Sequence, residues 1–214
     1  FRQLTDGKGA VVVGMGYVKA EREPRTSEQK LALQYKELDQ LQRLIEQLPS
    51  RLRLDRSRVY LAGISKGGWQ VSAFAQSGRP EVAGYVILLA GRVPRGRVDR
   101  PNLEGRAVYI GNGESDKAIV HSRMAAQFFE RCDARVTSEE YPGRGHEIDP
   151  SAPRLKAWVD MYLGETGSER RSQAQDWVAR RLDKARDTAV AADAYRILSD
   201  IAEDPRQRFC GDTL

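Results

Sequence analysis

The sequence has few of the residues that hold metals or build disulfide frameworks. Its 214 residues include only two histidines and two cysteines, Cys132 and Cys210. Neither cysteine lies in a CxxC pair or in a cluster with metal-ligand spacing, so we expect no metal site and no disulfide framework. Gly14-Met15-Gly16 has Lys19 in place of the third glycine of a dinucleotide fingerprint. We therefore expect a protein that works without a cofactor.

Long apolar runs and blocks of one charge are also missing. No stretch approaches the roughly 20 apolar residues of a membrane span. The 35 Lys and Arg are nearly balanced by 30 Asp and Glu, for a net charge of +5. No basic stretch is interleaved with aromatic residues, so nucleic acid is not an expected partner. The chain begins at Phe1, which is compatible with the removal of a targeting segment, and export is one open interpretation.

What the sequence does contain is an alternation of apolar strand-like runs with longer helical patterns. Such alternation predicts the α/β fold class, a mostly parallel sheet with helices on both faces. A capping box at Thr26 and Gln29 marks the start of one long helix, and Pro49 predicts its end. Strands are expected at 10–14, 59–62, 82–90, 107–110 and 134–141, and helices at 26–48, 65–76, 118–132 and 153–163.

The strongest functional motif is G-x-S-x-G, formed by Gly63, Ser65 and Gly67. It lies between the expected strand 59–62 and the helix that follows, which is the context of a nucleophile elbow. A tight turn there projects the serine hydroxyl above the sheet, and the two glycines are expected to relieve crowding in that turn. The backbone N–H of Lys66, at the start of the helix, is then placed to stabilise an oxyanion.

A nucleophilic serine needs a base and an acid that orients the base. His146 lies in a loop directly after the last expected strand, whereas His121 lies within a helix, so we predict His146 as the base. Asp116 follows the strand 107–110 and completes the order Ser, Asp, His. Glu114 is a competing acid in the same loop, and we predict that it is a solvated carboxylate instead.

The elbow, the loop that ends in Asp116 and the loop that ends in His146 resemble the α/β-hydrolase superfamily. More narrowly they are similar to its carboxylesterase/phospholipase-like group, which includes acyl-protein thioesterases and dienelactone hydrolases. The resemblance covers about residues 10–163. It implies a serine hydrolase with Ser65 as nucleophile, His146 as base and Asp116 as orienting acid. Lys66 departs from the group, in which Gln is common after the nucleophile, although only its backbone N–H is needed.

The start of the chain departs further from this resemblance. The fold normally supplies a second oxyanion donor from a loop after an earlier strand. Only one helix separates Ala10–Gly14 from the elbow strand, so we predict that Ala10–Gly14 pairs beside that strand and that the domain is incomplete at its N-terminus. An exposed sheet edge would result, and such an edge is a candidate surface for a protein partner.

The end of the chain has a different sequence pattern. Residues 164–168 are typical of a linker, and apolar residues from Val178 to Ile201 recur at helical spacing until Pro205. We predict two parts, a catalytic domain at 1–163 and a linker with a helical C-terminal extension at 164–214. The extension either packs on the main domain or binds a partner, and packing is the favoured interpretation.

Three functions fit this pattern. The favoured one is a serine hydrolase that cleaves carboxylic ester or thioester bonds of a small-molecule or acyl substrate through an acyl-enzyme on Ser65. The alternatives are a serine peptidase of the prolyl oligopeptidase-like type and a non-catalytic hydrolase-like binding scaffold. The shared fold cannot name the substrate.

Overall fold

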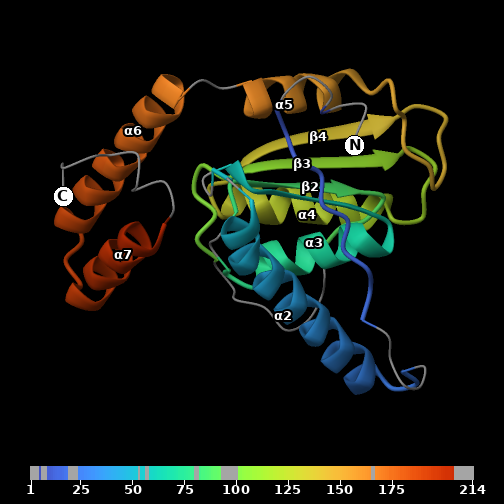
Figure 1. The fold of residues 1–214 in the computed structure, drawn as a ribbon, viewed down its shortest axis with the longest axis horizontal. Helices are drawn as coiled ribbons and strands as arrows, with labels where there is room; N and C mark the ends of the chain where they lie inside the picture. The colour runs from blue at the N-terminus through green and yellow to red at the C-terminus, as the bar shows by residue number, and fades with distance from the viewer. Residues whose placement is uncertain are drawn as a thin grey trace.

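The structure is a computed structural model of the 214-residue chain, and it describes Thr5 and residues 9–18, 24–52, 54–55, 58–79, 82–92, 101–164 and 167–204. Strands and helices alternate through the main domain, and two further helices follow it (Figure 1). The strands are β1 (Tyr60–Ile64), β2 (Gly84–Leu88), β3 (Ala107–Gly113) and β4 (Arg135–Tyr141). The helices are α2 (Ser27–Arg51), α3 (Lys66–Gln76), α4 (Ile119–Arg131), α5 (Pro153–Gly164), α6 (Gly167–Arg186) and α7 (Ala191–Glu203).

The described strands form one sheet in the order β1-β2-β3-β4, and every neighbouring pair is parallel. All residues of β2 and β3 are buried, as expected for central strands covered on both faces. Parallel strands with helical connections bring their carboxyl ends to one edge of the sheet. The predicted α/β architecture is therefore confirmed, and the loops after β1, β3 and β4 meet at that edge.

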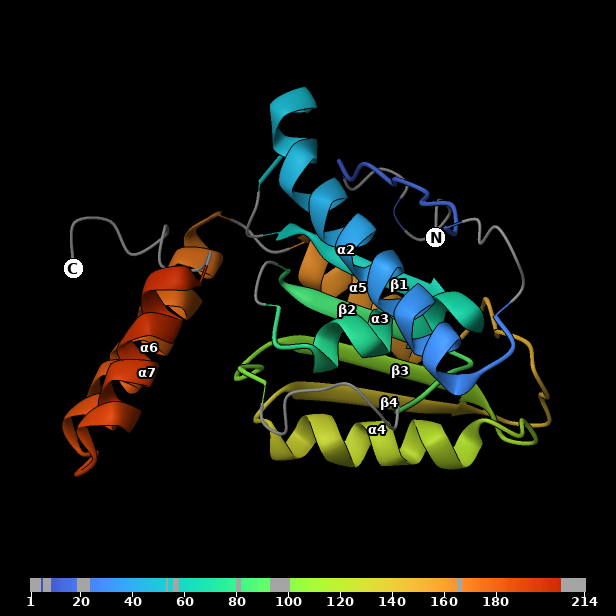
Figure 2. The same ribbon diagram turned by 90° about the horizontal axis from the view of Figure 1, so that it is seen from below.

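Helices cover both faces of the sheet, as Figure 2 shows. On one face α3 and α4 pack directly on the strands, and α2 packs against α3. A second apolar cluster joins α5 to the opposite face. Figure 2 shows α5 behind the sheet and the other three helices in front of it. None of the helices that the structure describes is long and apolar enough to cross a membrane.

Helix α2 begins as the sequence predicts and ends later. The Thr26 side chain accepts from Gln29 N–H, and the Gln29 side chain accepts from the Thr26 N–H, which together form the expected capping box. The helix continues through Pro49 to Arg51, so the prediction that Pro49 stops it is wrong. In the last turn a proline removes only one helical hydrogen bond, and Leu52 N–H still reaches Leu48 C=O at 2.9 Å.

The segment Ala10–Gly14 is not a strand, which corrects the prediction that it pairs beside the elbow strand. It forms no ladder with β1, and Val11, Val12 and Val13 are 60%, 44% and 44% exposed. An apolar β-branched run becomes a strand only where a neighbour completes its hydrogen bonds. Here the chain turns toward α2 instead, and Met15 packs against the core. β1 is therefore an edge strand of the described sheet.

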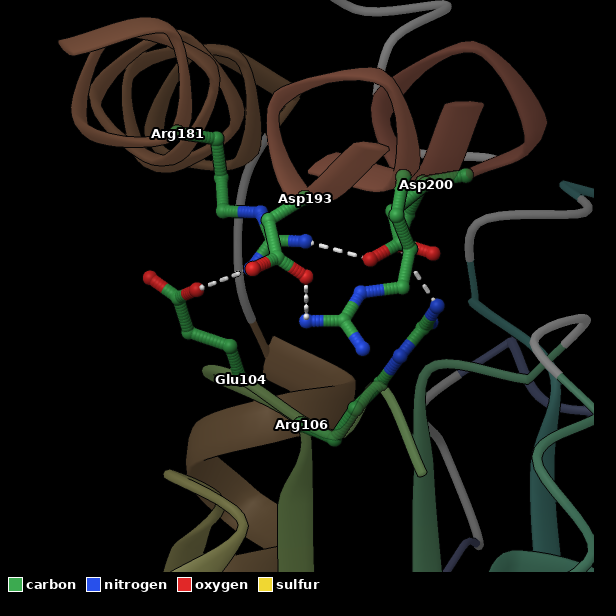
Figure 3. Close-up of polar contacts among 7 residues, drawn as sticks. Glu104, Arg106, Arg181, Asp193 and Asp200 are labelled. Atoms are coloured by element: carbon green, nitrogen blue, oxygen red, sulfur yellow. Dashed lines mark hydrogen bonds and ion pairs between the residues drawn. The ribbon is translucent and has the colours of Figure 1, made fainter. Parts of the chain in front are cut away.

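The C-terminal extension is a pair of helices rather than one amphipathic stretch. α6 and α7 pack against each other around a small core of their own that includes Trp177 and Ile197. They lie beyond the amino ends of the strands (Figure 1). Arg106, next to the start of β3, pairs with Asp204 at 2.7 Å, and Arg181 pairs with Glu104 at 3.0 Å (Figure 3). The favoured interpretation, packing on the main domain, agrees with these contacts.

The structure describes part of the predicted linker and one of the two cysteines. α5 ends at Gly164 and α6 begins at Gly167, so most of the stretch expected as a linker is helical. Cys132 is buried. Cys210 lies outside the described residues, as does the stretch after Asp204. The division of the chain into parts at residue 163 stays a prediction.

Candidate active site

Ser65 lies in a strained turn between β1 and α3. Its φ is +52° and its ψ is −116°, a conformation that non-glycine residues rarely adopt. Two backbone hydrogen bonds hold it there: Ser65 N–H donates to Leu88 C=O at 2.8 Å, and Trp69 N–H donates to Ser65 C=O at 3.0 Å. The turn therefore presents the hydroxyl at the carboxyl edge of the sheet, as the elbow motif predicts.

The glycines around this turn have different roles. A Cβ on Gly63 would collide with the backbone carbonyl of Gly67, so the first glycine of the motif is required by close approach of two backbones. A Cβ on Gly67 would meet only the Tyr17 hydroxyl, at an ordinary contact distance of 3.5 Å. The expectation that Gly67 relieves crowding is therefore wrong. Gly68 does have that role, since its Cβ would lie 2.6 Å from Leu88 C=O.

Ser65, His146 and Asp116 lie in hydrogen-bond contact although they are far apart in the chain. His146 Nε2 is 2.7 Å from Ser65 Oγ, and His146 Nδ1 is 2.7 Å from Asp116 Oδ2. A carboxylate at Nδ1 selects the tautomer with the proton on Nδ1, which leaves Nε2 free to accept the serine proton. The Asp116 side chain is only 4% exposed, whereas that of His146 is 52% exposed and accessible to a substrate.

The Asp116 carboxylate is held by further donors. Ala118 N–H donates to its Oδ1 at 2.9 Å. With its amide oriented to satisfy both neighbours, the buried Asn112 donates to Asp116 Oδ2 at 3.2 Å and accepts from Ile119 N–H at 3.0 Å. The sequence analysis did not identify Asn112. The one available signal was its place, a polar residue at the carboxyl end of a central buried strand.

The loops that carry the acid and the base are bonded to each other. Glu114 N–H donates to Tyr141 C=O at 3.0 Å, and Ser115 N–H donates to Arg144 C=O at 2.9 Å. The Glu114 carboxylate accepts from Gly143 N–H at 3.1 Å. Glu114 thus stabilises the loop that ends in His146, which is a different role from the solvated carboxylate that the sequence predicts. It does not contact His146 in place of Asp116.

A partly buried polar cluster anchors the far end of the same loop. Glu139 accepts from the N–H groups of Arg154 and Leu155 at the start of α5, at 3.3 and 3.1 Å, and from the Tyr109 hydroxyl at 2.5 Å. The Tyr109 and Tyr141 hydroxyls are 3.3 Å apart. Burial raises the pKa of Tyr141 to about 12, and burial together with the Glu139 hydrogen bond raises the pKa of Tyr109.

The other candidates from the sequence lie beside the site. Lys66 is the first residue of α3, and no side chain caps this helix, because the Ser65 hydroxyl faces His146. The uncapped N–H groups and the helix dipole favour a negative charge next to Ser65.

His121 lies on α4 in edge contact with Trp69, with ring centroids 5.5 Å apart. It is exposed, and His146 rather than His121 contacts Ser65 and Asp116. Among the residues that the structure describes, no cluster of His, Cys, Asp and Glu has the makeup of a metal site.

Comparison with known proteins agrees with this architecture at the level of fold. No protein-family model matches the sequence, and a search of curated proteins finds no match. Among solved structures, a carboxylesterase of Bacillus cereus is similar with a TM-score of 0.60 and 19% identity, over 75% of this chain and 79% of that one. A phospholipase/carboxylesterase from Dyadobacter fermentans gives 0.54 and 16%, over 66% and 68%.

A third similar structure is SOBER1 of Arabidopsis thaliana, with a TM-score of 0.50 and 17% identity. The match covers 62% of this chain and 65% of SOBER1, so it spans less than two thirds of that protein. Identities this low carry information about fold alone. The chain therefore has the α/β-hydrolase fold found in carboxylesterase/phospholipase-like proteins, with a helical C-terminus.

Proposed function

We propose that this chain is a serine hydrolase that cleaves carboxylic ester or thioester bonds through an acyl-enzyme on Ser65. The observation that carries the proposal is the continuous pair of 2.7 Å contacts from Asp116 through His146 to Ser65, at a strained turn between a strand and a helix. Those residue types in that geometry are what nucleophilic catalysis by a serine needs. The esterases among the similar structures support the same class of reaction.

In the first half of the reaction Ser65 Oγ attacks the acyl carbon while its proton passes to His146 Nε2. The charge that forms on the imidazole is stabilised by Asp116 at Nδ1. The negative charge that forms on the acyl oxygen lies at the uncapped amino end of α3, where the Lys66 N–H is the donor. As the tetrahedral intermediate collapses, the bond to the alcohol or thiol breaks, and that group leaves with the proton from Nε2.

Water completes the cycle. His146 Nε2 takes one proton from the water as its oxygen bonds to the acyl carbon. The Ser65 ester bond then breaks, the proton returns to Oγ, and the carboxylic acid leaves. The half-exposed His146 ring places this chemistry where water reaches it directly.

The direct test is covalent labelling with a fluorophosphonate probe, followed by mass spectrometry of the labelled peptide. We expect a single modified residue, Ser65, and loss of both labelling and p-nitrophenyl ester turnover in Ser65→Ala. The matched control is Ser77→Ala, since Ser77 caps the other end of α3 through Phe74 C=O and lies away from His146. It should keep both activities.

The outcomes separate the proposal from the other functions that fit the sequence. Labelling at Ser65 with turnover of proline-containing peptides but not of short-chain esters or thioesters would identify a peptidase. A folded chain that does not react with the probe would be a binding scaffold. Either result refutes the esterase proposal.

A further inference from the structure

A buried carboxylate that the proposed reaction does not use lies beside the helix that follows Ser65. Glu37 on α2 has a side chain that is only 1% exposed, and a buried glutamate is rare unless it is paired. The Gln70 side chain donates to its Oε2, and Lys66 Nζ lies 3.5 Å from its Oε1. Lys66 and Gln70 are one turn apart on α3, so both present the same face of that helix to Glu37.

The ammonium group of Lys66 has a second partner on its other side. Its Nζ lies 3.9 Å from the centre of the Tyr17 ring, which is a cation–π contact. The Tyr17 hydroxyl also lies close to the backbone at Gly67, the next residue of α3. The segment 9–18, helix α2 and the first turn of α3 therefore meet at one lysine side chain. We call Tyr17, Glu37 and Lys66 the lysine clamp.

The clamp fixes a side chain that would otherwise be free. The Lys66 side chain is 56% exposed, and a lysine at a surface normally samples many rotamers. Two contacts from different segments hold the Lys66 side chain in one rotamer. The same residue carries the backbone N–H next to the strained Ser65. An oxyanion donor stabilises the transition state because it is already held in place before the negative charge develops. Contacts that fix the residue of the donor should therefore affect the energy of the transition state.

We propose that Glu37 and Tyr17 are positioning residues that hold Lys66, and with it the first turn of α3, so that the Lys66 N–H stays directed at the oxyanion. This inference rests on the function proposed above. Neither side chain touches the reacting atoms, and both act through Lys66. The role is specific to the transition state, since the N–H stabilises charge that the bound substrate does not yet carry.

The test compares ester kinetics with binding of a trifluoromethyl ketone, which adds to the serine and forms an oxyanion. In Glu37→Gln we expect kcat and the affinity for this inhibitor to fall together, each about tenfold, with KM changed less than twofold. The loss should stay below the roughly 10²–10³ that follows removal of a whole oxyanion donor. Tyr17→Leu should show the same pattern, because it removes the ring that faces the ammonium group.

A double-mutant cycle checks that the effect passes through Lys66. Lys66→Met keeps the backbone N–H and removes the ammonium group. In that background, Glu37→Gln should cost no further kcat and no further inhibitor affinity, because the contact on which it acts is already lost. Additive losses in the double variant would overturn the proposed route.

The matched control is Arg79→Gln. Arg79 joins the same two helices at the far end of α3, through Asp39 at 2.6 Å and Leu38 C=O at 3.2 Å. It should lower the melting temperature while kcat and inhibitor affinity stay within twofold of the wild type. If Glu37→Gln also leaves both within twofold, or if Arg79→Gln reduces them equally, Glu37 is structural only. A wild-type chain that hydrolyses no ester refutes the proposed function itself, and this inference with it.

Discussion

Among the contacts that dock the C-terminal helices, the most deeply buried ion pair joins Arg106 to Asp204, and its removal has a predictable cost. Arg106 and Asp204 have side chains that are 2% and 0% exposed, and Arg106 also donates to Val82 C=O at 2.5 Å. Arg106→Met leaves the Asp204 carboxylate buried with its cation gone. Breaking such a pair from one side costs about 3–5 kcal/mol. That is a large part of the 5–15 kcal/mol that typically separates folded from unfolded domains.

Undocking of the two C-terminal helices would avoid part of this cost. α6 and α7 have a core of their own, so they can separate from the sheet and return Asp204 to water. The free energy lost with the ion pair then weakens docking rather than the fold of either part, and the two parts of the chain unfold at different urea concentrations. With a slope of about 1–3 kcal/mol per molar urea, a cost of 3 kcal/mol moves the transition of the helices down by roughly 1–3 M.

Tryptophan fluorescence can follow the two parts separately. Trp177 lies in the core of α6 and α7, while Trp69 and Trp158 lie in the main domain. One reporter background is Trp69→Phe with Trp158→Phe, and the other is Trp177→Phe. In the wild type both reporters should show one shared transition. In Arg106→Met the Trp177 transition should move to lower urea, ahead of the main domain.

Two companion variants make the result specific. Arg106→Met with Asp204→Leu removes both charges and should recover most of the loss, since replacing a whole buried pair by apolar residues is often close to neutral. Arg186→Met breaks a pair whose side chains are 75% and 68% exposed and should have almost no effect. The reasoning is refuted if Arg106→Met leaves the Trp177 midpoint within about 0.3 M of wild type, or if the double variant is no better than the single.

Three further predictions concern the site and its support. Asp116→Asn should lower kcat about 10⁴-fold in ester assays with the fold retained, because the amide selects the wrong tautomer of His146; Asn112→Ala should cost only about tenfold, the value of one hydrogen bond to a charged group. Gly63→Ala should destabilise the chain by about 1–3 kcal/mol in urea and abolish probe labelling, whereas Gly67→Ala should be tolerated. Finally, burial raises the pKa of both Tyr85 and Tyr141 to about 12. A group whose pKa is raised in the folded state contributes its full stabilisation below its unfolded pKa of about 10 and loses it as the pH rises to 12. The free energy of unfolding from urea titrations should therefore fall by up to about 3 kcal/mol per tyrosine across that window, and by less in Tyr141→Phe.

The elbow and its partners were predictable because local pattern and topology agree there. A strand, a glycine-flanked serine and a helix follow each other within the span 60–76, so the sequence order alone predicts the turn, although Leu88 C=O on the neighbouring strand also holds it. Parallel strands then bring the loops after β1, β3 and β4 to one edge, whichever side chains line it. His146 is the one histidine in those loops, and Asp116 is predicted from its place after the strand 107–110 and from the order Ser, Asp, His, with Glu114 as the competing acid.

What the sequence could not predict depends on neighbours in space. Ala10–Gly14 has the composition of a buried strand, but no neighbour completes its hydrogen bonds in the described structure. Asn112 and Glu37 look like ordinary polar residues until their partners on other segments are known. Local pattern identified Gly63 correctly but chose Gly67 instead of Gly68, because the crowding at Gly68 comes mainly from Leu88 on the neighbouring strand.

The docking contact lies at the amino ends of the strands, and the candidate active site lies at their carboxyl ends. An electrostatic effect of docking on the site can therefore be told apart from a mechanical effect. β3 has seven residues, begins beside Arg106, carries Asn112 near its carboxyl end and leads into the loop that carries Asp116. At about 3.3 Å per residue the strand spans roughly 20 Å. At that distance a Coulomb interaction is weak, and the half-exposed His146 lies in contact with water and salt, so a charge removed at Arg106 should have little electrostatic effect on His146. All seven residues of β3 are buried between helices on both faces, which leaves the strand little freedom to shift. Arg106→Met should therefore keep wild-type kcat wherever the main domain stays folded, and a kcat that falls with docking would show that the helices act on Asp116 mechanically, through β3.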